Sequence, residues 1–314
     1  MAKSGGGAHD GHEHAHGHSH THSPKSFGFA FAVGVALNTA FVVLEAIFGV
    51  IGNSTALLAD AAHNLSDVLG LLVAWAAAGL SRRPPTARFT YGLRGSSILA
   101  ALFNAMFLLV AIGGIGWEAV QRISQPEPVA EMTVIVVALV GIAINGGTAW
   151  LFVSGRKDDI NIQGAFLHMA ADAAVSAGIV IAATIILYTG WLWIDPAVSL
   201  VICVVFLWGT WGLLKASTQM SLDAVPAGID PAAVRTFLQA RPGVVEVHDL
   251  HIWPMSTTET ALTCHLVMPS GHPGDHFILE TAHELQHRFK IGHSTMQIET
   301  SMATGCTLAS EEVV

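Results

Sequence analysis

Two segments of this sequence place a histidine four residues before an aspartate, in otherwise apolar surroundings. The first pair is His63 and Asp67, and the second is His168 and Asp172. Residues i and i+4 lie one turn apart on the same face of a helix, so each pair presents a nitrogen and a carboxylate together. If the two helices face each other, four ligands meet at one point. Such a set suits a tetrahedral zinc site and contains no sulfur ligand for a softer ion.

The alternative for each pair is structural, with the histidine hydrogen-bonded to a neighbouring helix and no ion bound. A single motif of this length is too common to decide between the two interpretations. However, these are the only two histidines between residues 23 and 247, and each has an aspartate one turn further on. Ionisable residues at membrane depth are costly and mark functional sites. The duplication therefore favours a metal site.

The composition indicates that the helices carrying these pairs lie in a membrane. Of the 314 residues, 52% are hydrophobic and only 12% are charged, whereas globular domains carry about 25% charged residues. Six apolar stretches can each cross the ~30 Å hydrocarbon layer as a helix of about 20 residues. They lie near 27–51, 57–80, 97–120, 130–154, 162–188 and 192–214. We therefore predict an all-α membrane domain of six helices over residues 26–215.

The connections between these stretches differ in their content of Lys and Arg. One side of the membrane receives Lys3, Lys25, Arg82, Arg83, Arg88, Arg94, Arg156, Lys157 and Lys215, and the other receives only Arg122. Positively charged loops stay on the cytoplasmic side, so both termini are expected there. The net charge of −9 argues against nucleic acid as a partner. Cys203, Cys264 and Cys306 form no CxxC pair, which indicates neither a disulfide scaffold nor a thiolate zinc site.

The two ends of the chain have a different character from the apolar centre. Residues 1–25 contain seven histidines and no apolar run, so they are not a signal peptide and are expected to be a disordered cytoplasmic tail. This tail either delivers and buffers zinc or binds it only incidentally. Residues 216–302 have the composition of a small soluble domain, and residues 303–314 form a C-terminal tail.

The soluble region has the pattern of an αββαβ domain. A helix is predicted from Asp230 to Arg241, with Pro231 in its first turn and Pro242 and Gly243 ending it. Strands are predicted at 244–253, 260–268 and 294–300, and a second helix at 275–290. Such a small α+β domain is expected to gain stability from dimerisation or from metal.

Two further carboxylates in the apolar stretches need an explanation. Glu45 is alone in the first stretch and requires a partner, so it either handles protons or is buried in protonated form. Asp60 lies three residues before His63, near the outer end of the second stretch. A residue at the mouth of the pathway, a helix cap and a ligand all fit this position.

Several motifs in the expected order make the chain resemble the cation diffusion facilitator family, in its zinc-exporting branch. Besides the two HxxxD pairs, the resemblance rests on residues 56–63 (ALLADAAH), 91–94 (YGLR), 98–105 (ILAALFNA), 189–196 (TGWLWIDP), 248–253 (HDLHIW) and 293–299 (HSTMQIE). It implies a homodimeric, proton-coupled antiporter that moves Zn²⁺, and also Cd²⁺ or Co²⁺, out of the cytoplasm. It also implies a ferredoxin-like cytoplasmic domain and a bacterial inner membrane.

The resemblance also bears on further metal sites. Some members carry a second site after the second helix, but residues 82–94 contain no histidine and no acid, so it is not expected here. By matching family positions, we expect His248, His265 and Glu299 to form a site in the soluble domain. Strict alternation would put His248 and His251 on opposite strand faces, so one site would use only one of them. His276 and His293 remain possible ligands, and solvated surface histidines are the alternative.

Two other functions compete with transport. Residues 283–287 read HExxH, as in zinc proteases, and His293 follows where a third ligand could lie. The glycine that such a protease needs is replaced by Lys290, and a small αββαβ domain offers little room for a cleft. The third function is a membrane metal sensor that binds zinc without flux. We expect a transporter and not an enzyme.

Overall fold

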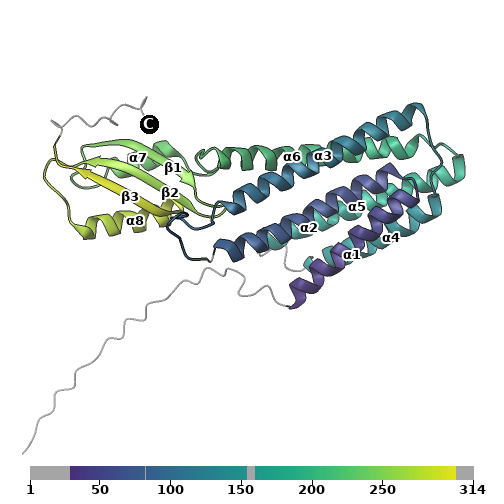
Figure 1. The fold of residues 1–314 in the computed structure, drawn as a ribbon, viewed down its shortest axis with the longest axis horizontal. Coiled ribbons are helices and arrows are strands. Elements are labelled where there is room, and N and C mark those ends of the chain that lie inside the picture. The colour runs from purple at the N-terminus through teal and green to yellow at the C-terminus, as the bar shows by residue number, and fades with distance from the viewer. Residues whose placement is uncertain (1–28, 82, 154–159, 302–314) are drawn as a thin grey trace, which may run out of the picture.

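Figure 1 shows the computed structural model of the chain, which describes residues 29–81, 83–153 and 160–301. The predicted histidine-rich tail and the C-terminal tail lie outside these residues. The described chain forms a bundle of six helices, with a smaller α+β domain at one end of it (Figure 1). This architecture confirms the predicted fold class.

The six helices of the bundle follow one another directly in the sequence. They are α1 (Phe29–Ile51), α2 (Thr55–Ser81), α3 (Ser96–Ser124), α4 (Glu131–Phe152), α5 (Ile160–Thr189) and α6 (Ile194–Ser221). Within the described residues, five of them contain a stretch long and apolar enough to cross a membrane, and α1 contains the shorter apolar stretch Asn38–Ile51. Helix α6 ends seven residues beyond its predicted end at 214, because no proline or glycine lies between Leu214 and Ser221.

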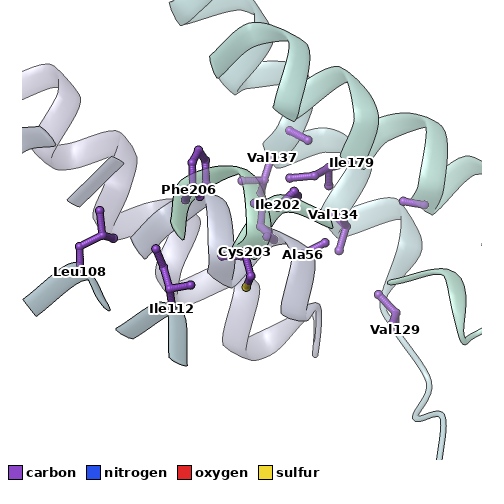
Figure 2. Packing of buried hydrophobic residues seen from close by; sticks show 14 residues of the cluster. Ala56, Leu108, Ile112, Val129, Val134, Val137, Ile179, Ile202, Cys203 and Phe206 are labelled. Atoms are coloured by element: carbon purple, nitrogen blue, oxygen red, sulfur yellow. The ribbon is translucent and has the colours of Figure 1, made fainter. Parts of the chain in front are cut away.

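Helix α2 lies at the centre of the bundle and packs against α1, α3, α5 and α6. Helices α3 and α6 lie side by side, as do α4 and α5 (Figure 1). Figure 2 shows the buried cluster where these helices meet α2. It joins Ala56 of α2, Leu108 and Ile112 of α3, Val137 of α4, Ile179 of α5, and Ile202 and Phe206 of α6. Close packing of this kind fixes the positions of α2 and α5 relative to each other.

The end of the bundle away from the α+β domain is closed by polar contacts. Asp195, at the start of α6, accepts hydrogen bonds from Ser54 Oγ at 2.5 Å, Thr55 N at 2.7 Å and Thr55 Oγ1 at 2.8 Å. The carboxylate therefore caps the N-terminus of α2 from another helix. Beside it, the Arg122 guanidinium donates to Asn53 O at 2.8 Å and to Asn53 Oδ1 at 2.7 Å.

The α+β domain has the predicted order of elements. It contains α7 (Pro231–Gln239), β1 (Glu246–Pro254), β2 (Thr260–Val267), α8 (Asp275–Phe289) and β3 (Ile291–Glu299). The sheet has the order β1-β2-β3, with β1 antiparallel and β3 parallel to the central β2. Asp230 caps α7 by accepting a hydrogen bond from Ala232 N at 2.9 Å. The two helices and the sheet enclose one apolar core.

Polar contacts join the segment between α2 and α3, together with the first turn of α3, to the loop between β1 and β2. Arg94 pairs with Glu259 at 3.0 Å, and Thr257 N donates to Ser97 Oγ at 3.1 Å. The Tyr91 ring also meets the His293 ring edge to face, with centroids 5.5 Å apart. The position of the α+β domain is therefore linked to the helix that follows the first HxxxD pair.

A thiol in the core of the α+β domain leads to a first prediction. Burial raises the pKa of Cys264 to about 12, and the Asp249 charge adds to this effect. Only the thiolate reacts with iodoacetamide, and at pH 9 about one Cys264 side chain in a thousand is ionised in the folded protein. We expect alkylation of Cys264 only after unfolding, as measured by peptide mapping. Equal labelling rates in folded and unfolded protein would contradict this burial.

Candidate metal sites

The two HxxxD pairs meet at one place in the bundle. His63 Nε2 lies 3.5 Å from Asp67 Oδ2 and 3.6 Å from Asp172 Oδ1. His168 Nε2 lies 3.2 Å from Asp67 Oδ2 and 3.6 Å from Asp172 Oδ2. Each histidine thus contacts the aspartate of its own helix and that of the other helix. We call His63, Asp67, His168 and Asp172 the bundle site.

The four residues of the bundle site are not equivalent. One ligand atom from each of His63, His168 and Asp172 lies within 4.8 Å of the other two, whereas Asp67 stands outside this mutual group. The Asp172 side chain is 5% exposed and that of Asp67 is 35% exposed. Asp172 therefore occupies the enclosed side of the site, and Asp67 the open side.

Helix α6 fixes the orientation of one ligand. The Phe206 ring stacks on the His63 ring, with centroids 3.8 Å apart and planes 20° apart. His63 Nδ1 is buried without a hydrogen-bond partner, while Nε2 points to the two aspartates. This stacking directs Nε2 into the site and limits rotation of the imidazole.

A cavity of about 620 Å³ reaches the bundle site. Besides Asp67, His168 and Asp172, it is lined by Asn38, Asn104 and Asn145. These asparagines come from the halves of α1, α3 and α4 that lie nearer the α+β domain. The site is therefore approached from the domain end, while the Asp195 contacts close the other end.

Asp60 lies neither at the mouth of a pathway nor at a helix cap, which were two of the positions expected for it. Asp60 is 0% exposed and accepts a hydrogen bond from Ser176 Oγ of α5 at 3.1 Å. It cannot cap α2, because that helix begins five residues earlier and Asp195 caps it from α6. Sequence reasoning missed the role of Asp195, since nothing local links residues so far apart.

The second group of ligands lies on one face of the α+β sheet. His265 Nδ1 is 2.9 Å from Glu299 Oε1, and His248 Nε2 is 3.4 Å from the same oxygen. One ligand atom from each of the three residues lies within 4.8 Å of the other two. His248 is buried, and neither of its ring nitrogens has a hydrogen-bond partner. We call His248, His265 and Glu299 the sheet site.

A bulge in β1 overturns the expected strict alternation along that strand. His248 pairs with His265, and His251 pairs with Thr263, so three steps on β1 match two on β2. Because His265 and Thr263 share a face of β2, the bulge brings His248 and His251 to the same face. Asp249, at φ +50°, makes the bulge, and its carboxylate lies 2.8 Å from His251 Nε2 and 3.4 Å from His265 Nε2.

Four other histidines of the domain lie away from the sheet site. His276 is 95% exposed beside Glu280, and His293 packs against Tyr91. In the HExxH run, Glu284 accepts a hydrogen bond from Arg288 Nε at 2.6 Å, and the His283 and His287 rings lie 4.5 Å apart. None of these four histidines belongs to a group of three close metal-ligand atoms among the described residues.

Comparison with known proteins finds two matching families. Residues 31–220 match the family described as "Cation efflux transmembrane domain", and residues 226–301 match "Cation efflux protein, cytoplasmic domain". The first match ends one residue before the end of α6, and the second begins at residue 226, ahead of α7. Together they cover both the bundle site and the sheet site.

Curated relatives match most of this chain. The "Metal cation efflux system protein CzcD" of Cupriavidus metallidurans is 36% identical over 85% of this chain and 85% of its own length. The "Zinc transporter ZitB" of Escherichia coli is 36% identical over 84% of each. The "Cadmium, cobalt and zinc/H(+)-K(+) antiporter" of Bacillus subtilis is 34% identical over 83% of this chain and 86% of its length.

A solved structure is titled "Metal-bound C-terminal domain of the CzcD transporter". It is 35% identical to this chain and covers 23% of it and 99% of its own length, with a TM-score of 0.21.

Proposed function

Because the chain belongs to the cation efflux family, we propose that it exports Zn²⁺ from the cytoplasm in exchange for protons. Membership makes it a multi-pass integral membrane transporter of divalent cations, and not an enzyme. The protease alternative at residues 283–287 is therefore set aside. The bundle site at the end of its cavity is the observation that carries the proposal.

The geometry supports a state that faces the cytoplasm. We place both termini and the α+β domain in the cytoplasm, at a bacterial inner membrane, in agreement with the positive charge of the loops on that side. The cavity then admits Zn²⁺ from the cytoplasm to His168 and Asp67, its more exposed ligands. The contacts of Asp195 and Arg122 close the outer end.

Competition between protons and metal at the bundle site supplies the exchange. Histidines must be neutral to bind Zn²⁺, so the metal displaces protons from His63 and His168 as it enters. After the outer end opens, protons from a more acidic exterior return to the ligands and release the metal.

Zinc uptake into inverted membrane vesicles tests this function. We expect the protein to drive zinc accumulation when the vesicle interior is acidic, and a protonophore to abolish it. Cd²⁺ and Co²⁺ should compete for entry, because a set of two histidines and two aspartates accepts all three ions. Zinc binding without gradient-driven accumulation would contradict the proposal and would indicate a metal sensor instead of a transporter.

The sheet site has a regulatory role in this proposal. Zn²⁺ held by His248, His265 and Glu299 would crosslink three strands and stabilise the domain that we expect to join two protomers. If occupancy changes the affinity of the bundle site, the two sites are coupled in both directions. The sheet site would then adjust export to cytoplasmic zinc.

Replacing His265 tests the sheet site. We expect His265→Ala in the full chain to bind one zinc ion fewer per protomer, with at least a tenfold loss of affinity at that site. Equilibrium dialysis with metal analysis measures the stoichiometry. His276→Ala, at an exposed position of the same domain, should retain the wild-type value. If His265→Ala binds as many zinc ions per protomer as the wild type, the sheet site does not bind zinc.

A further inference from the structure

Two carboxylates lie buried beyond the bundle site, on the side away from its cavity. Glu45 of α1 and Asp60 of α2 are both 0% exposed. Asp60 precedes His63 by one turn toward the closed end, where α2 begins. Its partner Ser176 follows Asp172 by one turn toward the same end of α5. The pair therefore lies between the metal ligands and the closed end.

Hydrogen bonds satisfy one oxygen of each carboxylate and leave the other without a donor. Asn64 Nδ2 donates to Glu45 Oε2 at 2.9 Å, and Ser176 Oγ donates to Asp60 Oδ2. Glu45 Oε1 and Asp60 Oδ1 are buried without a donor, although the two carboxyl groups are within hydrogen-bonding reach of each other. Ionised carboxylates only accept hydrogen bonds. One proton between the groups would turn this contact into an O–H···O hydrogen bond.

No cationic side chain balances this pair in the part of the chain that the structure describes. The ionisable groups that face it are His63 and Asp172, and neither Glu45 nor Asp60 is within ion-pair distance of a described histidine. The other acidic and basic residues of the packed helices are Asp67 and His168 at the cavity, Glu131, Glu118, Arg122 and Asp195 at the closed end, and Lys215 toward the α+β domain. Two bare carboxylates at this depth would be very costly.

We propose that Glu45 and Asp60 share one exchangeable proton and form a second proton-binding site in the transport cycle. This proposal rests on the antiport function proposed above. With the proton the pair carries a charge of −1. When Zn²⁺ enters the bundle site, its charge favours breaking the O–H bond, the proton leaves as H⁺, and the pair becomes −2.

The hydrogen bonds of the pair connect it to the metal ligands. Asn64 follows His63 directly, and Ser176 lies one turn from Asp172, so the residues that hold the carboxylates move with the helices that carry the ligands. When the outer end opens, a proton entering from outside meets the pair before it meets the bundle site. Protonation of the pair then restores the −1 state as the metal leaves.

Counting protons per zinc ion tests this site. The full chain is placed in proteoliposomes, and a zinc dye and a pH dye report both fluxes. We expect Glu45→Gln, Asp60→Asn and the double variant each to exchange about one proton fewer per zinc than the wild type, since the proton belongs to the pair. Glu131→Gln, in the first turn of α4, is the matched control and should keep the wild-type ratio.

Several results would overturn the proposal. The first is an unchanged number of protons per zinc ion in the single variants. The second is a double variant that loses twice as many protons per zinc ion as either single variant. The third is loss of zinc binding at the bundle site in these variants. A ratio that depends on Na⁺ or K⁺ only when Glu45 and Asp60 are present would assign an alkali cation instead. If Glu45→Gln does not fold, Asp60→Asn carries the same test.

Calorimetry separates this proposal from the antiport function itself. Zinc binding to the purified protein in two buffers of different ionisation enthalpy gives the protons released per zinc bound, without any transport. The variants should release about one proton fewer there as well. If the wild-type protein releases protons on binding zinc but shows no gradient-driven uptake, the antiport function is contradicted and the shared proton is not. If wild type and variants release equal numbers of protons, the shared proton of Glu45 and Asp60 is contradicted.

Discussion

Replacing Asp172 with alanine is expected to lower zinc uptake by on the order of 100-fold or more. Asp172 contacts both histidines of the bundle site and belongs to the mutual group of three ligand atoms. Its loss leaves three ligands and removes one of the two negative charges that offset Zn²⁺. Because the Asp172 side chain is 5% exposed, water has less access to the place of this carboxylate than to that of Asp67, which is 35% exposed.

The geometry predicts a smaller effect for the other aspartate. Asp67 lies on the open side of the site, where its side chain is 35% exposed and water from the cavity can take its place. We therefore expect Asp67→Ala to lower uptake less than Asp172→Ala and to act mainly on the apparent affinity for zinc. His63→Ala should resemble Asp172→Ala, because Phe206 holds this imidazole in place for the metal.

Initial rates over a range of zinc concentrations in inverted vesicles measure these effects. Glu284→Gln is a suitable control, since it removes a carboxylate of the HExxH run and lies outside the bundle. Membrane expression of each variant must match the wild type. Full transport by Asp172→Ala, or a greater loss in Asp67→Ala, would reject the assigned roles.

The features that could be predicted from the sequence are those encoded locally. A helix that crosses a membrane needs about 20 successive apolar residues, and the two HxxxD pairs each lie within one helical turn. The prediction that α2 and α5 lie close together required the further assumption that both HxxxD pairs bind the same ion. The structure brings the four residues together, with Asp67 at the open edge.

The features that could not be predicted depend on contacts between distant segments or on a local exception. Asp195 is 140 residues from Thr55, and no spacing rule connects them. Glu45 and Asp60 each looked isolated, and only the packing of α1 on α2 makes them a pair. The bulge at Asp249 broke the alternation rule, although Asp tolerates a positive φ better than most residues do, and this was the available signal.

Asp195→Ala is expected to destabilise the bundle by at least about 3 kcal/mol, because each hydrogen bond to a charged group contributes about 1.5–3 kcal/mol. The substitution removes the acceptor of three hydrogen bonds and leaves Ser54 Oγ, Thr55 N and Thr55 Oγ1 buried without it. It also removes the negative charge at the N-terminus of α2. Asp195→Asn should lower the stability less, because the amide oxygen still accepts a hydrogen bond. Some loss remains, because the amide NH₂ group faces another donor.

Thermal unfolding of the purified protein in detergent measures this loss as a lower midpoint. The control is Asp223→Asn, an exposed position beyond the opposite end of α6, which should leave the midpoint unchanged. A double-mutant cycle of Asp195→Asn with Thr55→Val measures the coupling between the carboxylate and the Thr55 hydroxyl, and additivity of the two effects would refute that hydrogen bond. A strong coupling would mean that opening the outer end must break these hydrogen bonds. The same carboxylate would then set both the stability of the fold and the height of the barrier to outward release.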